Sequence, residues 1–140
     1  MKGLPTLIRV HQWELEEKRR QLAELEDMRD QFIRELARLE ESLLENQRVA
    51  AYSPEVASTY GHYANQVIER RAVINQSIKE SQFAVDEAHD VVHTAFQEVK
   101  KYETAQERIE ARLLKEENRR EQVELDELGL NMFRRKNGEQ

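Results

Sequence analysis

Apolar residues recur along this chain at intervals of three and four, in two series separated by a short break. The first series has twelve inward positions, of which eight are apolar, and they are Ile8, His11, Leu15, Lys18, Leu22, Leu25, Arg29, Phe32, Leu36, Leu39, Leu43 and Asn46. A mean spacing of about 3.5 residues is typical of a helix in a coiled coil. The pattern therefore predicts one long helix with an apolar stripe, its seam, that faces a second helix.

The second series has the same rhythm and is longer. It has sixteen inward positions, of which thirteen are apolar: Tyr60, Ala64, Val67, Arg71, Ile74, Ile78, Ser81, Val85, Ala88, Val92, Ala95, Val99, Tyr102, Gln106, Ile109 and Leu113. The residues between them are mostly Glu, Arg, Gln and Asp, which suits solvated flanks. Beyond Leu113 the rhythm fails, because Glu116 and Arg120 occupy the next positions.

Helix-breaking residues divide the chain between the two series. The segment Ser53-Pro54-Glu55 combines an N-cap, a proline at the first helical position and an acid in the first turn. Thr6 can cap the first helix, with Pro5 outside it, and Gly129 can end the second. We therefore expect a single domain with an N-terminal extension at 1–5, helices at 6–52 and 54–128 around a turn at 53, and a flexible basic tail at 129–140.

A tight turn makes the two helices antiparallel neighbours of unequal length. Counting from the turn places Leu43 near Tyr63 and Ile8 near Glu98, to within a few residues. The second helix then extends past the first by roughly 30 residues, or about 45 Å. Its inward residues Tyr102, Ile109 and Leu113 would have no partner within the chain, which predicts a binding surface, although fraying or self-association would also account for them.

Composition supports a narrow helical fold and disfavours several functional classes. Charged residues make up 36% of the chain and the net charge is −6, so a phosphate-backbone binder is not expected and no nucleic-acid partner is predicted. There is no cysteine, and no apolar run reaches the ~20 residues that span a bilayer. We expect a soluble intracellular chain.

The candidate chemistry is weak. His89 and His93 have the spacing of a helical zinc motif, but the intervening acid is Asp90 and no third ligand is evident. Paired carboxylates are frequent, yet two helices offer no cleft to shift their pKa. We predict no enzyme activity, no metal and no cofactor.

Two further patches are candidate contact sites. Tyr52, Tyr60 and Tyr63 gather near the turn, either as an interface or to hold the loop closed. Past Gly129, the basic run 134–136 follows several apolar residues and could contact a partner or an anionic membrane surface.

Three segments give the chain a family resemblance. They are the N-terminal pattern L-x-x-L-x-R-V over Leu4 to Val10, the turn Tyr52-Ser53-Pro54-Glu55 followed by Tyr60 and Tyr63, and Leu125-Asp126-Glu127 running to Arg134-Arg135. With these segments the whole chain resembles the FliJ family, the small coiled-coil components of the bacterial flagellar type III export apparatus.

The resemblance implies an all-α fold, a long antiparallel two-helix coiled-coil hairpin whose second helix is the longer, with a non-enzymatic role. FliJ-like proteins act as the stalk of the hexameric export ATPase, link it to the membrane export gate protein and bind export chaperones. They are cytoplasmic monomers, peripheral at the cytoplasmic face of the cell membrane through their partners. The ATPase-contact candidates are Trp13, Tyr102, Ile109 and Leu113. The export-gate candidates are Leu39, Leu43, Tyr60, Tyr63, Val67 and Ile74.

Other functions remain open at this point. The injectisome has a counterpart, the YscO-like stalk, and sequence separates the two poorly. A generic structural coiled coil that self-associates, or a binder of membrane or nucleic acid through the basic tail, would also fit parts of the pattern.

Overall fold

The computed structural model describes residues 3–138 and contains two helices in this range. Helix α1 runs over Leu4–Tyr52 and helix α2 over Pro54–Gly138, so of the described residues only Gly3 and Ser53 lie outside a helix. The predicted fold class is confirmed: the chain is an all-α antiparallel coiled-coil hairpin with a longer second helix. Residues 1–2 and 139–140, which belong to the predicted N-terminal extension and C-terminal tail, lie outside the described range.

The turn consists of Ser53 alone. Its amide donates to the carbonyl of Val49 at 3.2 Å and completes α1, while its own carbonyl accepts from the amide of Ala57 at 3.0 Å and begins α2. Pro54 occupies the first helical position, where no hydrogen bond from its nitrogen is required. Glu55 places a negative charge in the first turn, where it complements the helix dipole. The break thus falls at the residue that the sequence singles out.

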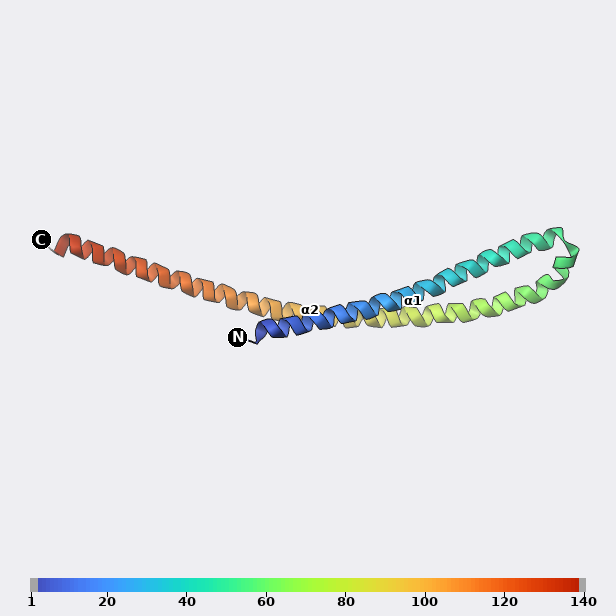
Figure 1. Cartoon of the computed structure of the whole chain (residues 1–140), viewed down its shortest axis with the longest axis horizontal. Helices are drawn as coiled ribbons and strands as arrows, with labels where there is room; N and C mark the ends of the chain where they lie inside the picture. The colour runs from blue at the N-terminus through green and yellow to red at the C-terminus, as the bar shows by residue number, and fades with distance from the viewer. Residues whose placement is uncertain (1–2, 139–140) are drawn as a thin grey trace. The chain divides into compact units, whose positions relative to one another are not determined.

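The chain divides into two compact units, each described by itself. The bend unit comprises residues 12–96, and the terminal unit comprises residues 1–11 and 97–140. In the bend unit, the α1 and α2 segments lie side by side and antiparallel on either side of Ser53 (Figure 1). Its buried residues are Leu15, Leu22, Val67, Ile74, Ser81 and Val85.

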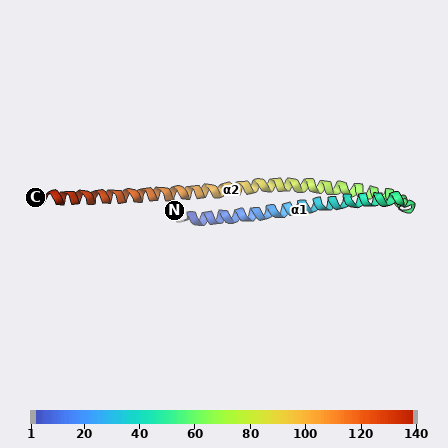
Figure 2. The ribbon, with the colours of Figure 1, turned by 90° about the horizontal axis from the view of Figure 1, so that it is seen from above.

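In the terminal unit, the first turns of α1 lie beside α2, and α2 then continues alone (Figure 2). Leu4 and Ile8 of α1 and Val99 of α2 are its buried residues. From Glu110 to Gly138 every residue except Glu116 is exposed. We call residues 110–138 the overhang.

The predicted inward positions are the ones that fold inward. All twelve positions of the α1 series are buried or half-buried, as are fifteen of the sixteen in the α2 series. The exception is Leu113, which is 64% exposed. Periodicity alone therefore identified both seams.

The helix bounds differ from the predicted ones at both ends of the chain. Helix α1 begins at Leu4 and includes Pro5, because a proline in the first turn removes no helical hydrogen bond; the amide of Leu7 donates to Gly3 at 3.0 Å. Helix α2 does not end at Leu128 but continues through Gly129 to Gly138, so the predicted tail is helical over 129–138. Gly129 does not have the positive φ of a C-cap, and one glycine within a helix costs only about 1 kcal/mol.

The predicted register holds near the turn and fails at the other end. The hydroxyls of Ser42 and Tyr63 are 2.8 Å apart, next to the predicted neighbours Leu43 and Tyr63. Pairing Ile8 with Glu98 would put His11 near Ala95, whereas the His11 ring stacks on Tyr102 with centroids 4.8 Å apart.

The cause of this difference is packing. Glu98 is not a seam position of α2, whereas Val99 and Tyr102 are, and burial favours the register that sets seam against seam. The overhang therefore begins after Ile109, and Tyr102 lies within the covered part of α2.

Candidate partner-binding surfaces

The overhang presents apolar side chains that nothing in the described chain covers. Besides Leu113, its exposed large apolar residues are Leu114, Val123, Leu125, Leu128, Leu130, Met132 and Phe133. A helix with this much uncovered apolar surface is marginal by itself, because helices in proteins gain most of their stability from tertiary packing. The overhang is therefore the strongest candidate for a surface that packs on another molecule.

The four predicted ATPase-contact residues have different environments. Tyr102 is half-buried beneath His11 and also has the Lys101 ammonium 5.4 Å from its ring centroid, so the expectation that α1 leaves it uncovered is wrong. Ile109 is half-buried, and Leu113 is exposed. Trp13 is exposed as well but belongs to the bend unit.

A local ion-pair cluster lies near the start of the overhang. Arg119 donates to the carboxylate of Glu116 at 2.7 Å, and Arg120 lies 3.8 Å from the same carboxylate. The hydrogen bond from Arg119 and its positive charge lower the pKa of Glu116, and the same hydrogen bond and the negative charge of Glu116 raise the pKa of Arg119. This cluster replaces the apolar seam where the heptad rhythm fails.

Two of the predicted export-gate residues are core residues. Val67 is 3% exposed and Ile74 is 2% exposed, because both are inward positions of α2 covered by α1. Neither can contact a partner while the hairpin is closed. Leu39, Leu43 and Tyr60 are half-buried along the same seam.

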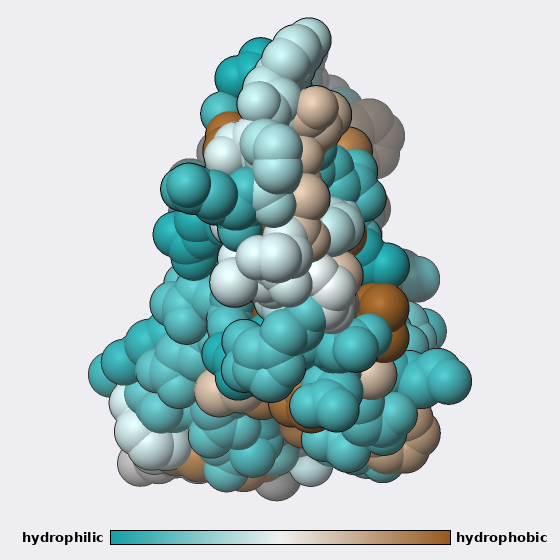
Figure 3. Space-filling view, turned by 90° about the vertical axis from the view of Figure 1, so that its right-hand side faces the viewer, coloured by the Kyte–Doolittle hydropathy of each residue, from teal (hydrophilic) through white to brown (hydrophobic). Residues whose placement is uncertain are grey.

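The tyrosines near the turn divide between two roles. The rings of Tyr60 and Tyr63 are 6.4 Å apart, and the hydrogen bond between Tyr63 and Ser42 ties α2 to α1. Tyr52, in contrast, is 86% exposed. Figure 3 looks onto the turn and shows a mostly hydrophilic face with isolated hydrophobic residues. Tyr63 therefore links the two helices while staying only half-buried, and Tyr52 is accessible.

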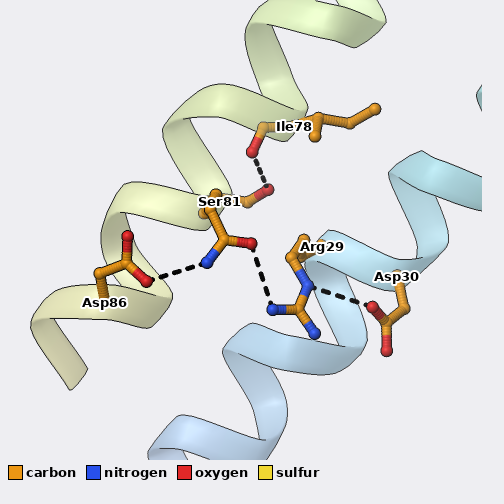
Figure 4. Close-up of polar contacts among 6 residues, drawn as sticks. Arg29, Asp30, Ile78, Ser81 and Asp86 are labelled. Carbon is orange, nitrogen blue, oxygen red and sulfur yellow. Dashed lines mark hydrogen bonds and ion pairs between the residues drawn. The ribbon is translucent and has the colours of Figure 1, made fainter. Parts of the chain in front are cut away.

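A polar layer interrupts the seam in the middle of the bend unit (Figure 4). Arg29, an inward residue of α1, donates to the Gln82 side-chain oxygen at 3.2 Å and to Asp30 at 3.1 Å. Gln82 in turn donates to Asp86 at 2.9 Å, and the buried Ser81 hydroxyl donates to a backbone carbonyl one turn earlier. The sequence marked Arg29 and Ser81 as polar seam positions, but the hydrogen bonds that join the helices depend on register and could not be predicted.

Within the described residues, two further features would indicate a function: a metal site and a helix that could cross a membrane. No group of three or more possible ligands that could hold a metal ion occurs in residues 3–138, and His89 and His93 are both exposed. No described helix combines the length and the apolar character needed to cross a bilayer.

A comparison with protein families identifies the family of this chain. The family model described as Flagellar FliJ protein matches residues 1–138. No curated protein and no solved structure matches the chain.

Proposed function

Because the chain belongs to the flagellar FliJ family, whose members are structural components of the flagellar export apparatus, we propose that it is the stalk of the hexameric export ATPase. In this proposal the overhang docks in the ATPase, and the hairpin connects it to the membrane export gate protein and to export chaperones. The protein acts as a monomer at the cytoplasmic face of the membrane, held there by its partners. The family assignment favours the flagellar system over the injectisome counterpart.

The exposed overhang is the observation that carries this proposal. Its apolar residues lie on a single helix, from Leu113 to Phe133, with no second helix in the described chain to cover them. Burial of apolar surface contributes about 25 cal/mol per Å², so a protein that encloses this helix gains binding energy that the chain itself does not use. Docking also provides the packing that a single helix lacks.

Fewer residues can contact the export gate protein than the family resemblance implies. Since Val67 and Ile74 are buried, we restrict the contact to the half-buried edge formed by Leu39, Leu43, Tyr60 and Tyr63.

The test is stimulation of ATP hydrolysis by the purified export ATPase. Wild-type chain should bind the ATPase and raise its rate, and the double variant Leu113→Glu with Leu125→Glu should lose both effects while keeping its helicity. The matched control is Ile68→Glu with Phe83→Glu, because Phe83 is 65% exposed and both residues lie on α2 outside the overhang. Absence of binding by the folded wild-type chain would rule out the stalk role, and a stable dimer in sedimentation would support self-association in its place.

A further inference from the structure

The charges at the start of the overhang and in the two residues before it are separated onto two sides of the helix. Glu110, Glu117 and Glu124 follow one another at seven-residue intervals, with Glu121 beside them; we call these four the acidic stripe. A second set, at intervals of four, three and four, forms the basic stripe, which comprises Arg108, Arg112, Lys115 and Arg119. All eight residues are exposed.

The two stripes flank the line of inward positions, which runs through Ile109, Leu113, Glu116 and Arg120. Residues seven apart return to the same side of a coiled-coil helix. Glu110 directly follows the inward Ile109, and Arg112 directly precedes the inward Leu113, so the acidic and basic stripes take the two opposite edges of the seam. These edge positions are the ones that choose a partner in coiled coils.

Most of these charges are unpaired within the chain. In residues 3–138, only Arg119 of the basic stripe has an ion pair, with Glu116, and no acidic-stripe carboxylate has one. Seven of the eight charged side chains in the two stripes therefore have no ion pair within the described chain and are available to a second molecule. Opposite charges that meet across an interface steer association and fix orientation.

A second copy of the chain does not satisfy this pattern. Antiparallel pairing of two overhangs would bring acidic stripe against acidic stripe and basic against basic. Parallel pairing would allow Arg112 to form an ion pair with Glu117 of the other copy. It would also place like charges opposite each other at inward positions, Glu116 against Glu116 and Arg120 against Arg120. The acidic stripe likewise opposes adsorption to an anionic membrane.

We propose that residues 108–124 bind between an acidic edge and a basic edge of a different protein, with the exposed Leu113 against an apolar contact between those edges. The proposal rests on the docking role proposed above and takes the export ATPase as that protein. The partner's surface then has an acidic edge that contacts the basic stripe and a basic edge that contacts the acidic stripe.

Two charge-reversal variants of the full chain test this assignment. The basic-stripe variant is Arg108→Glu, Arg112→Glu and Lys115→Glu, which leaves the Glu116–Arg119 pair in place. The acidic-stripe variant is Glu110→Lys, Glu117→Lys and Glu124→Lys. Matched controls reverse exposed charges of the same types elsewhere: Arg34→Glu, Arg38→Glu and Lys79→Glu for the first, and Glu24→Lys, Glu41→Lys and Glu69→Lys for the second.

Binding to the ATPase is measured by calorimetry at two salt concentrations, after circular dichroism shows that each variant is helical. Each stripe variant should bind about tenfold or more weakly than wild type, whereas the controls stay within about twofold. Wild-type affinity should fall with added salt, and the stripe variants should show less of this dependence.

The outcomes separate this inference from the proposed function. If the wild-type chain binds and both stripe variants bind as tightly as their controls, the two-sided surface is disproved while the stalk role stands. If only one variant weakens binding, the partner has one charged edge and the inference is wrong. If wild type binds phosphatidylglycerol vesicles but not the ATPase, and the acidic-stripe variant binds the vesicles more tightly, the occupant is a membrane.

Discussion

One helix, α2, has two environments that differ mainly in the presence of α1. In the bend unit, Val67, Ile74 and Val85 are removed from solvent by the facing helix. In the overhang, Leu125, Leu128 and Met132 have comparable size and hydrophobicity and are exposed. The overhang has charges at Glu116 and Arg120, where apolar residues would continue the seam, and its apolar residues are exposed because no facing helix covers them.

The comparison shows how an unequal hairpin separates stability from binding. Burial in the bend unit contributes about 1.5–3 kcal/mol for each fully covered aliphatic side chain. The same residue types in the overhang contribute no burial energy until a partner covers them. Substitutions in the two regions should therefore have opposite consequences, the first for folding and the second for association.

The largest expected effect comes from placing a charge in each region. Ile74→Glu buries a carboxylate without a partner and removes apolar packing, so the free energy of unfolding should fall by at least the 2–5 kcal/mol that truncating a buried Ile costs. Leu113→Glu should change it by less than about 0.5 kcal/mol, since that side chain is already exposed. Urea unfolding followed at 222 nm measures both. Equal destabilisation by the two variants would mean that the overhang is core.

A smaller effect is expected at the polar layer. Arg29→Leu replaces a half-buried charge by an apolar seam residue, and Gln82 keeps its bond to Asp86. Stability should rise by about 1 kcal/mol, as when buried polar groups are replaced by packed apolar ones. The two helices should then be able to pair in more than one register, since polar seam residues specify which residues pair.

Cysteine pairs can report that register, because the chain has no cysteine of its own. A short bis-maleimide should join Ser42→Cys to Tyr63→Cys in the parent chain. It should join Ser42→Cys to Arg70→Cys, one heptad further, more readily in the Arg29→Leu background. A lower melting temperature for Arg29→Leu would show that the layer stabilises the hairpin instead.

The smallest effect is expected near the turn. Tyr63→Phe removes the hydrogen bond to Ser42, and its loss should cost about 0.5–1 kcal/mol because the bond is exposed to solvent. Thermal unfolding of the variant beside Tyr52→Phe provides the comparison, since Tyr52 is 86% exposed and its substitution should have no effect. Identical shifts for the two variants would show that the Ser42 contact contributes nothing.

Much of the fold follows from local rules that sequence carries directly. The three-four rhythm locates the inward residues of both helices, and Ser53-Pro54 locates the break, because each depends on a few neighbouring residues. The helix bounds were harder: Pro5 and Gly129 are breakers only in some positions of a helix, and the outcome depends on the residues around them.

The register between the two helices and the residues that form the exposed surfaces could not be predicted from local sequence patterns. The stacking of His11 on Tyr102 depends on how the two seams interlock over the full length of α1, which a count from the turn does not capture. The family resemblance named Val67 and Ile74 as contact residues, but both are inward positions of α2 and are buried. The two charge stripes become meaningful only once the overhang is known to lack a covering helix.

Hydrogen exchange along α2 tests the central claim, that one part of this helix is covered by α1 and another part awaits a partner. In the free chain, amides of residues 67–99 should be strongly protected, while amides of 114–136 should exchange almost as fast as those of an isolated helix. Adding the export ATPase should slow exchange over 114–136 and leave 67–99 unchanged. Equal protection of both segments in the free chain, or no change over 114–136 in the ATPase complex, would contradict this account.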